Sequence, residues 1–188
     1  MGQRDRFLSE GTGHTAGKEE PWTGEEEAEA LKEALDSVSD QNVFFQMNLF
    51  DSHDTPRLHN DKSIYDRNIY KGVVMAQYML PGMPNLYYGD EVSLGGVLGS
   101  NEGARYPMEW REEKWDEDML SFHRAMGEAR KEAWLGFSSY SVISLDEEAF
   151  AILRFVEGKA YVAVINRGED REVEVPLFLL PSNSLEVI

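Results

Sequence analysis

The sequence predicts an α/β fold that is followed by an all-β region. Between residues 24 and 134, segments with helical spacing alternate with short apolar segments that are typical of buried strands. After Gly136 the apolar residues recur at every second position, which is typical of strands with one buried face. We therefore place a domain boundary near Leu135, which divides the chain into residues 1–135 and 136–188.

The first predicted helix covers residues 24–38. Thr23 and Glu26 have the spacing of a capping box, in which each side chain accepts a hydrogen bond from the backbone amide of the other residue. The acidic run at residues 25–27 is interpreted as a solvated helix start. Apolar residues then recur at helical spacing and give the helix one buried face: Ala28, Leu31, Leu35 and Val38.

Residues 43–50 are predicted to form a strand that is buried on both sides. This segment reads VFFQMNLF, and apolar runs of this kind are typical of strands in parallel sheets. A second helix is predicted from Ser63 to about residue 80, where a Pro-Gly pair ends it. A short strand is expected at residues 85–88. It is followed by a glycine-rich loop over residues 89–111, and loops of that length usually serve function.

The remaining elements are one helix and several short strands. The helix is predicted over residues 116–134, and His123 lies in its apolar stripe. Residues 150–156 and 159–166 flank Glu157-Gly158, so they predict a β-hairpin. Further short strands are expected at residues 171–175 and 185–188.

The composition excludes several classes of function. The chain has 188 residues, of which 35 are acidic and 18 are basic, and its formal net charge is −17. Such a charge argues against binding to nucleic acid and against docking on an anionic membrane. The absence of cysteine excludes disulfides, thiolate catalysis and cysteine-based zinc sites. No cofactor is expected.

The sequence contains no apparent targeting or membrane segment. Its first residues, MGQRDRFLSEGTGHT, are polar and lack the apolar region of a signal peptide. No apolar run reaches the roughly 18 residues that are needed to cross a bilayer. We therefore expect a soluble, cytoplasmic protein with no membrane partner.

Two ionisable residues, His53 and Asp54, lie directly after the strand predicted at residues 43–50. In a (β/α)8 barrel the carboxyl ends of the strands face the active site. There Asp54 could stabilise positive charge, and His53 could donate a hydrogen bond to a substrate oxygen. The alternative is structural: Asp54 caps the following turn through Thr55, and His53 is an ordinary loop histidine.

Three motifs resemble the α-amylase family of glycoside hydrolases. Residues 50–58 (FDSHDTPRL) resemble the fourth signature region of that family. Residues 80–91 (LPGMPNLYYGDE) resemble its eighth barrel strand with the loop that follows, and residues 105–110 (RYPMEW) resemble its Pro-Met-x-Trp element. The Ser-His-Asp-Thr form of the first motif is most similar to the neopullulanase, cyclomaltodextrinase and maltogenic amylase branch. The resemblance covers roughly residues 25–135.

The resemblance implies hydrolysis or transfer of α-glucosidic bonds with retention of configuration. That chemistry needs a nucleophilic carboxylate and a general acid/base about 5 to 5.5 Å apart. A third acidic residue steadies the oxocarbenium-like transition state, and the resemblance places this role on Asp54. It places the substrate-binding histidine on His53 and implies an α-glucan oligosaccharide as substrate. Whether the site needs a metal is left open.

The motif that carries the nucleophile in this family, Gly-x-Arg-x-Asp, belongs well upstream of the residues seen here. Residues 2–5 (GQRD) echo it, but no strand-like run precedes them and too few residues separate them from Asp54. Glu10, Glu19 and Glu20 lie in a polar loop, so none of them is assigned as the general acid.

The resemblance therefore implies the last part of a TIM (β/α)8 barrel, followed by a C-terminal antiparallel β-sandwich. A complete barrel takes about 250 residues, so this chain is too short to form one. An isolated arc of two barrel strands would expose an apolar edge. We expect another polypeptide to supply the N-terminal barrel strands, or the chain to be a product of a longer enzyme. This chain alone is expected to be inactive.

Two further functions were considered, together with plainer roles for other residues. The first alternative is a non-catalytic carbohydrate-binding or scaffold subunit that has lost the other acids, and the second is an unrelated acidic α/β module. Asp90 and Glu91 could touch substrate or a cation, or simply accept hydrogen bonds from backbone amides. Trp110 and Trp115 could stack on sugar rings or pack at the domain junction.

Overall fold

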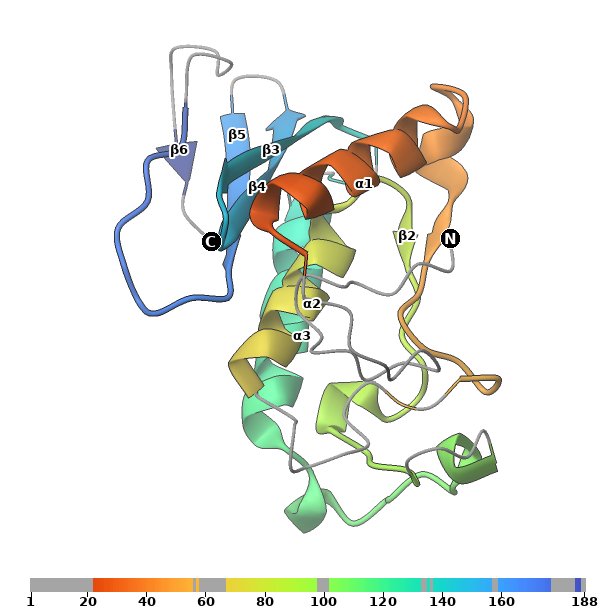
Figure 1. Ribbon diagram of the computed structural model, residues 1–188. Coiled ribbons are helices and arrows are strands. Elements are labelled where there is room, and N and C mark those ends of the chain that lie inside the picture. The colour runs from red at the N-terminus through yellow and green to blue at the C-terminus, as the bar shows by residue number, and fades with distance from the viewer. Residues whose placement is uncertain are drawn as a thin grey trace.

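The structure is a computed structural model that describes residues 22–55, 57, 67–97, 102–132, 135, 137–156, 159–176 and 185–186. A β-sheet lies at one end of the molecule and helix α1 (Gly24–Asp36) crosses it, while helices α2 (Arg67–Met79) and α3 (Glu117–Glu132) run side by side away from the sheet (Figure 1). Loops that precede α3 form the opposite end. None of the helices in the described ranges is long and apolar enough to cross a membrane.

Helix α1 (Gly24–Asp36) confirms the predicted helix and its capping box. The amide of Glu26 donates to Thr23 Oγ1 at 3.2 Å, and the amide of Thr23 donates to Glu26 Oε2 at 2.8 Å. Gly24 lies so close to the sheet that a Cβ atom there would collide with the carbonyl oxygens of Asp146 and Ala149. Its amide donates to Glu147 O at 2.9 Å, so the start of α1 is fixed against the turn that joins strands β3 (Ser139–Asp146) and β4 (Ala149–Val156).

We expect Thr23→Ala to lower the free energy of unfolding by about 1 kcal/mol, because it removes the oxygen that caps the first turn of α1. Urea unfolding followed by circular dichroism measures this change. Glu26→Gln is the matched control, since Gln retains an acceptor for the Thr23 amide and should cost far less. Equal losses in the two variants would show that the cap contributes nothing specific.

The strand predicted at residues 43–50 is much shorter in the structure. Residues Asn42–Phe45 form a 3-10 turn, and β1 covers only Met47–Asn48. The prediction of burial on both sides is also wrong for this segment, because Phe45 is 66% exposed and Met47 is 53% exposed. Among the described residues β1 has a ladder partner on one side only, so few backbone hydrogen bonds hold the segment extended.

Strand β2 (Met83–Pro84) lies just before the residues 85–88 that were predicted as a strand. It pairs in parallel with β1, with Met47 opposite Met83 and Asn48 opposite Pro84. The Asn85 amide continues the ladder by donating to Asn48 O at 2.8 Å. The carboxyl ends of both strands therefore lie at the same edge of this small sheet.

Helices α2 (Arg67–Met79) and α3 (Glu117–Glu132) pack against each other. Helix α2 ends before the Pro-Gly pair, as predicted, whereas its predicted start at Ser63 lies outside the described residues. Helix α2 also connects β1 to β2, which completes a β-α-β unit. Its buried face packs with α1, α3 and the larger sheet to form one hydrophobic core. This core includes Leu35, Val73, Met79, Met126, Val142 and Ile152.

The larger sheet has the strand order β3-β4-β5-β6, with β3 at Ser139–Asp146, β4 at Ala149–Val156, β5 at Lys159–Asn166 and β6 at Leu185–Glu186. The predicted hairpin is confirmed as β4 and β5, which are antiparallel. The predictions missed β3, because only its Val142 is buried and its alternation is weak. The strand predicted at residues 171–175 is wrong, since these residues are irregular.

The described residues of the β region form one sheet, with α1 and α2 packed against it. The two-sheet sandwich and the domain boundary near Leu135 both stay predictions.

One residue connects this sheet to the helices. Arg154 of β4 is fully buried and donates to several carbonyl oxygens, namely Met79 O at 2.5 Å, Ser138 O at 2.9 Å, Ser139 O at 3.4 Å and Leu135 O.

Candidate active site

The candidate site follows the carboxyl end of β1. The amide nitrogen of the Gln77 side chain, buried on α2, donates to Asn48 O at 2.9 Å and to Asn85 O at 2.8 Å. This one side chain therefore bridges β1 and the residue after β2, and it fixes the strand ends relative to each other. The loop that leaves β1 contains the two residues that the sequence singled out, His53 and Asp54.

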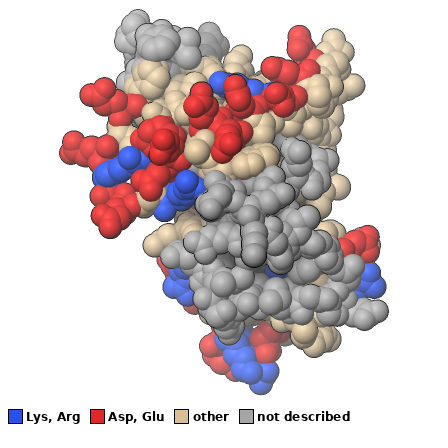
Figure 2. Space-filling view, viewed as in Figure 1, with Lys and Arg blue, Asp and Glu red and all other residues tan. Residues whose placement is uncertain are grey.

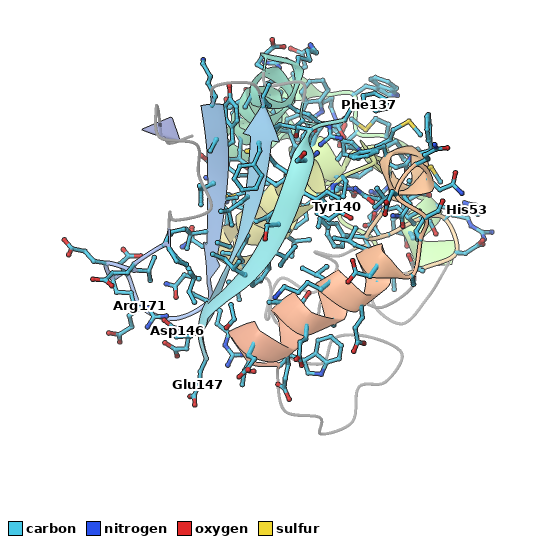
Figure 3. The ribbon with its side chains drawn as sticks, turned by 90° about the horizontal axis from the view of Figure 1, so that it is seen from above. His53, Phe137, Tyr140, Asp146, Glu147 and Arg171 are labelled. Carbon is cyan, nitrogen blue, oxygen red and sulfur yellow. The ribbon has the colours of Figure 1, made fainter. Side chains whose placement is uncertain are left out.

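His53 and Asp54 lie together on the surface of this loop. Their side chains are 66% and 68% exposed, and His53 Nε2 lies 3.1 Å from Asp54 Oδ2. His53 projects at the edge of the molecule (Figure 3). The pair is thus open to a ligand, as its predicted roles require.

The structure argues against Asp54 as the cap of its own turn. Hydroxyl groups close that turn: the Ser52 amide donates to Thr55 Oγ1 at 2.9 Å, and the Asp54 amide donates to Ser52 Oγ at 3.1 Å. The Asp54 carboxylate instead contacts His53 and Arg105. Its two oxygens are therefore held by side chains at the surface of the site.

Arg105 is a site residue that the sequence analysis quoted only as part of a motif. It ends the short 3-10 segment Glu102–Arg105 in the long loop after β2. Its Nη2 lies 3.1 Å from Asp54 Oδ1, and its Nε donates to His53 O at 2.8 Å. Arg105 thus orients the carboxylate of Asp54. A separation of 51 residues along the chain hid this contact from the sequence.

A buried ion pair lies beneath the loop. Arg57 Nη1 contacts Asp90 Oδ1 at 3.0 Å, and both side chains are buried. The Arg57 guanidinium also lies over the rings of Tyr87 and Tyr88, 4.5 Å and 4.7 Å from their centroids. Its Nε donates to Ala104 O at 3.2 Å. Both predicted roles for Asp90, contact with a ligand and capping of backbone amides, are therefore replaced by an internal ion pair.

Asp51 is a second buried carboxyl beside this ion pair. Burial raises the pKa of Asp90 well above its ordinary value, and the neighbouring Asp51 raises it further, while Arg57 opposes the shift. Asp51, Arg57 and Asp90 therefore form one buried cluster.

The remaining candidates have plainer roles. Glu91 Oε2 accepts from the Gly89 amide at 2.9 Å, which fits the backbone interpretation. Trp115 donates through its ring nitrogen to Glu109 O at 2.5 Å, whereas Trp110 is 77% exposed and is not buried in packing. His123 is buried beside Tyr78, as expected for a structural residue.

No group of acidic and histidine side chains within the described ranges has the geometry of a metal site. The sequences that were weighed for a nucleophile and a general acid, residues 2–5 and Glu10, Glu19 and Glu20, lie outside the described residues. The described site contains Asp54 and His53, and their catalytic and substrate-binding roles stay predictions.

Two parallel strands that are joined by a helix and followed by ionisable side chains have the arrangement of one repeat of a (β/α)8-barrel enzyme. The chain belongs to the α-amylase family: the model of the α-amylase catalytic domain matches residues 9–140. This confirms the resemblance that the motifs indicated.

Curated relatives and solved structures agree with this membership. The chain is 43% identical over 79 residues to a cyclomaltodextrinase of a Bacillus species, and 32% identical over 147 residues to the cyclomaltodextrinase of Thermoanaerobacter pseudethanolicus. These matches cover 42% and 77% of this chain but only 14% and 24% of the two relatives. The ligand-free cyclic α-maltosyl-(1→6)-maltose hydrolase of Arthrobacter globiformis superposes with a TM-score of 0.75 at 26% identity, over 88% of this chain and 36% of the other.

Proposed function

We propose that this chain is the C-terminal part of a retaining α-glucan glycoside hydrolase, in which Asp54 stabilises the transition state and His53 binds substrate. The observation that carries the proposal is the placement of both side chains, exposed and in contact, after a parallel strand. Relatives named as cyclomaltodextrinases suggest maltodextrins, cyclodextrins or pullulan as substrates.

The proposed role of Asp54 is electrostatic. Cleavage of a glycosidic bond builds positive charge on the sugar ring, and a fixed carboxylate beside the ring attracts that charge more strongly in the transition state than in the ground state. Arg105 holds one oxygen of Asp54, which limits the reorganisation needed during the reaction. The nucleophile and the general acid would come from barrel strands other than β1 and β2.

We propose that a further polypeptide supplies those strands. Met47 and Met83 are register partners on β1 and β2, and both are more than half exposed. Burying large apolar side chains of this kind stabilises a fold by roughly 1.5–3 kcal/mol each. Phe45, in the turn that precedes β1, is exposed as well, and neighbouring barrel strands would cover these apolar side chains. Location in the cytoplasm stays a prediction.

No observation on the described residues favours a non-catalytic carbohydrate-binding or scaffold subunit, so we do not propose that alternative. The two hypotheses make different predictions about what accompanies the chain. A glycosidase requires further barrel strands that carry the missing acids, whereas a scaffold does not.

We expect the purified chain by itself to release no reducing sugar from maltodextrin, β-cyclodextrin or pullulan, because the described site holds one carboxylate of the required set. Native and intact mass spectrometry of the material from its source should reveal a partner, and the assembled complex should be active. Turnover by the chain alone would show that the nucleophile and acid lie within it. A complex that is inactive on all three substrates would contradict the proposed function.

We expect His53→Ala to reduce kcat/KM of the assembled enzyme by about tenfold, since the change removes one hydrogen bond to substrate. The loss should be smaller than that of any Asp54 variant, because no charge is removed. Steady-state kinetics on maltodextrin measures the effect, and an unchanged melting temperature shows that the fold is intact. A loss as large as that of Asp54→Asn would assign His53 more than a binding role.

A further inference from the structure

We propose that Asp90 is a positioning residue for the candidate site, because its carboxyl group fastens the Arg57 end of the 51–57 loop to the segment after β2. This proposal rests on the proposed function of Asp54 and His53 and goes beyond it. Arg57 closes the loop and contacts Asp90 Oδ1 at 3.0 Å, and Asp51, which opens the loop, is buried beside this ion pair. The loop between them carries His53 and Asp54 at its exposed tip.

A chain of contacts links Asp90 to the tip of the loop. Asp90 contacts Arg57, whose Nε donates to Ala104 O at 3.2 Å. The next residue in the sequence, Arg105, contacts Asp54 Oδ1 at 3.1 Å and donates to His53 O at 2.8 Å. Movement of Asp90 would therefore shift the Arg57 end of the loop and, through residues 104 and 105, the arginine that contacts the tip of the loop.

Stability alone does not explain this arrangement. A buried ion pair is often no more stabilising than apolar side chains of the same volume, because both charges lose their hydration. A second carboxyl beside it, Asp51, adds repulsion. The cluster instead fixes the orientation of the loop, because the planar guanidinium of Arg57 bonds only to partners in defined directions.

Hydrogen exchange on this chain tests the anchoring without any enzyme assay. Asp90→Asn keeps the shape of the side chain but removes its charge. We expect the amides of Asp54 and Thr55, which are bonded within the turn, to exchange at least tenfold faster, while α2 amides keep their rates. Asp118→Asn is the matched control, because Asp118 pairs with Lys71 at 2.8 Å on the surface. Equal exchange at the loop in wild type and Asp90→Asn overturns the proposal.

Kinetics of the assembled enzyme provide the second readout. We expect Asp90→Asn to lower kcat on maltodextrin about 10- to 100-fold with KM changed less than about threefold, since a misplaced catalytic group slows chemistry more than it weakens binding. Unchanged kcat overturns the proposal. If Asp54→Asn also leaves kcat unchanged, the proposed function is contradicted. The hydrogen-exchange experiment then still tests whether Asp90 anchors the loop.

A second variant covers the case in which Asp90→Asn does not fold, as circular dichroism would show. Arg57→Lys keeps a positive charge beside Asp90 but loses the Nε bond to Ala104. Faster exchange at Asp54 and Thr55 in this variant supports the proposal, and rates equal to those of wild type overturn it.

Discussion

Asp54→Asn is expected to lower kcat/KM of the assembled enzyme on maltodextrin by at least about 10²–10³-fold, the usual effect of removing one preorganised electrostatic partner from a transition state. The carboxylate is 68% exposed and is oriented by His53 and Arg105. The amide of Asn keeps the shape of the side chain but carries no net charge. The loss should therefore fall mainly on kcat, because the positive charge on the sugar develops during the reaction.

The fold of the Asp54→Asn variant should survive, because Ser52 and Thr55 close the turn and Asp54 makes its contacts at the surface. A melting curve within about 2 °C of wild type is expected alongside the kinetic loss. Glu109→Gln is a matched control: Glu109 also pairs with an arginine, Arg111, at 2.5 Å near the surface, but outside the site. Near-normal turnover by Asp54→Asn, or a loss explained by unfolding, would make Asp54 a structural residue.

Arg154→Met is expected to cause the largest loss of stability, about 3–5 kcal/mol or more. The guanidinium is buried and donates to carbonyl oxygens at the end of α2 and in residues 135–139. Met fills much of the volume but donates nothing, and each buried carbonyl left without a partner costs about 1–3 kcal/mol. A domain of this size has a total stability of only about 5–15 kcal/mol, so much of the variant should be unfolded.

The charge of Arg154 persists at neutral pH. Burial lowers its pKa to about 9, and nearby Arg130 contributes to the shift, yet the group remains protonated two pH units below that value. The carbonyl dipoles at the carboxyl end of α2 compensate the buried charge, because this end of a helix attracts cations. Arg154 therefore acts as a charged clamp between the sheet and α2.

Arg171→Met is the control for this prediction. Arg171 and Asp146 point toward each other at the edge of the sheet, with Nη2 and Oδ1 2.6 Å apart and both side chains partly exposed (Figure 3). Surface pairs of this kind contribute about 0–1 kcal/mol. Urea unfolding of both variants measures the difference. Similar midpoints for Arg154→Met and Arg171→Met would refute the clamp.

Acidic side chains gather over α1 on one face of the molecule (Figure 2). The exposed acidic residues of α1 are Glu25, Glu26, Glu29, Glu33 and Asp36. The negative charge that the composition revealed is therefore concentrated, in part, on the helix that covers the sheet and lies away from the 51–57 loop.

Local patterns in the sequence were enough to predict the elements whose stability is local. The capping box and apolar stripe predicted α1, and alternation around Glu157-Gly158 predicted β4 and β5. The same patterns failed for β1 and β2, because a strand forms only where a neighbour pairs with it. They also failed for residues 171–175, whose alternation finds no ladder.

Short motifs and periodicity were enough to predict the family, the helices and the hairpin, and to name His53 and Asp54 as candidates. Folding alone brings Arg105 to Asp54, gathers Asp51, Arg57 and Asp90 into one buried cluster, and places Arg154 between α2 and the sheet. These contacts join residues that lie far apart in the chain. The physical reason is that a charged side chain has no preferred partner until folding removes it from water and sets the distance to the groups that compensate it.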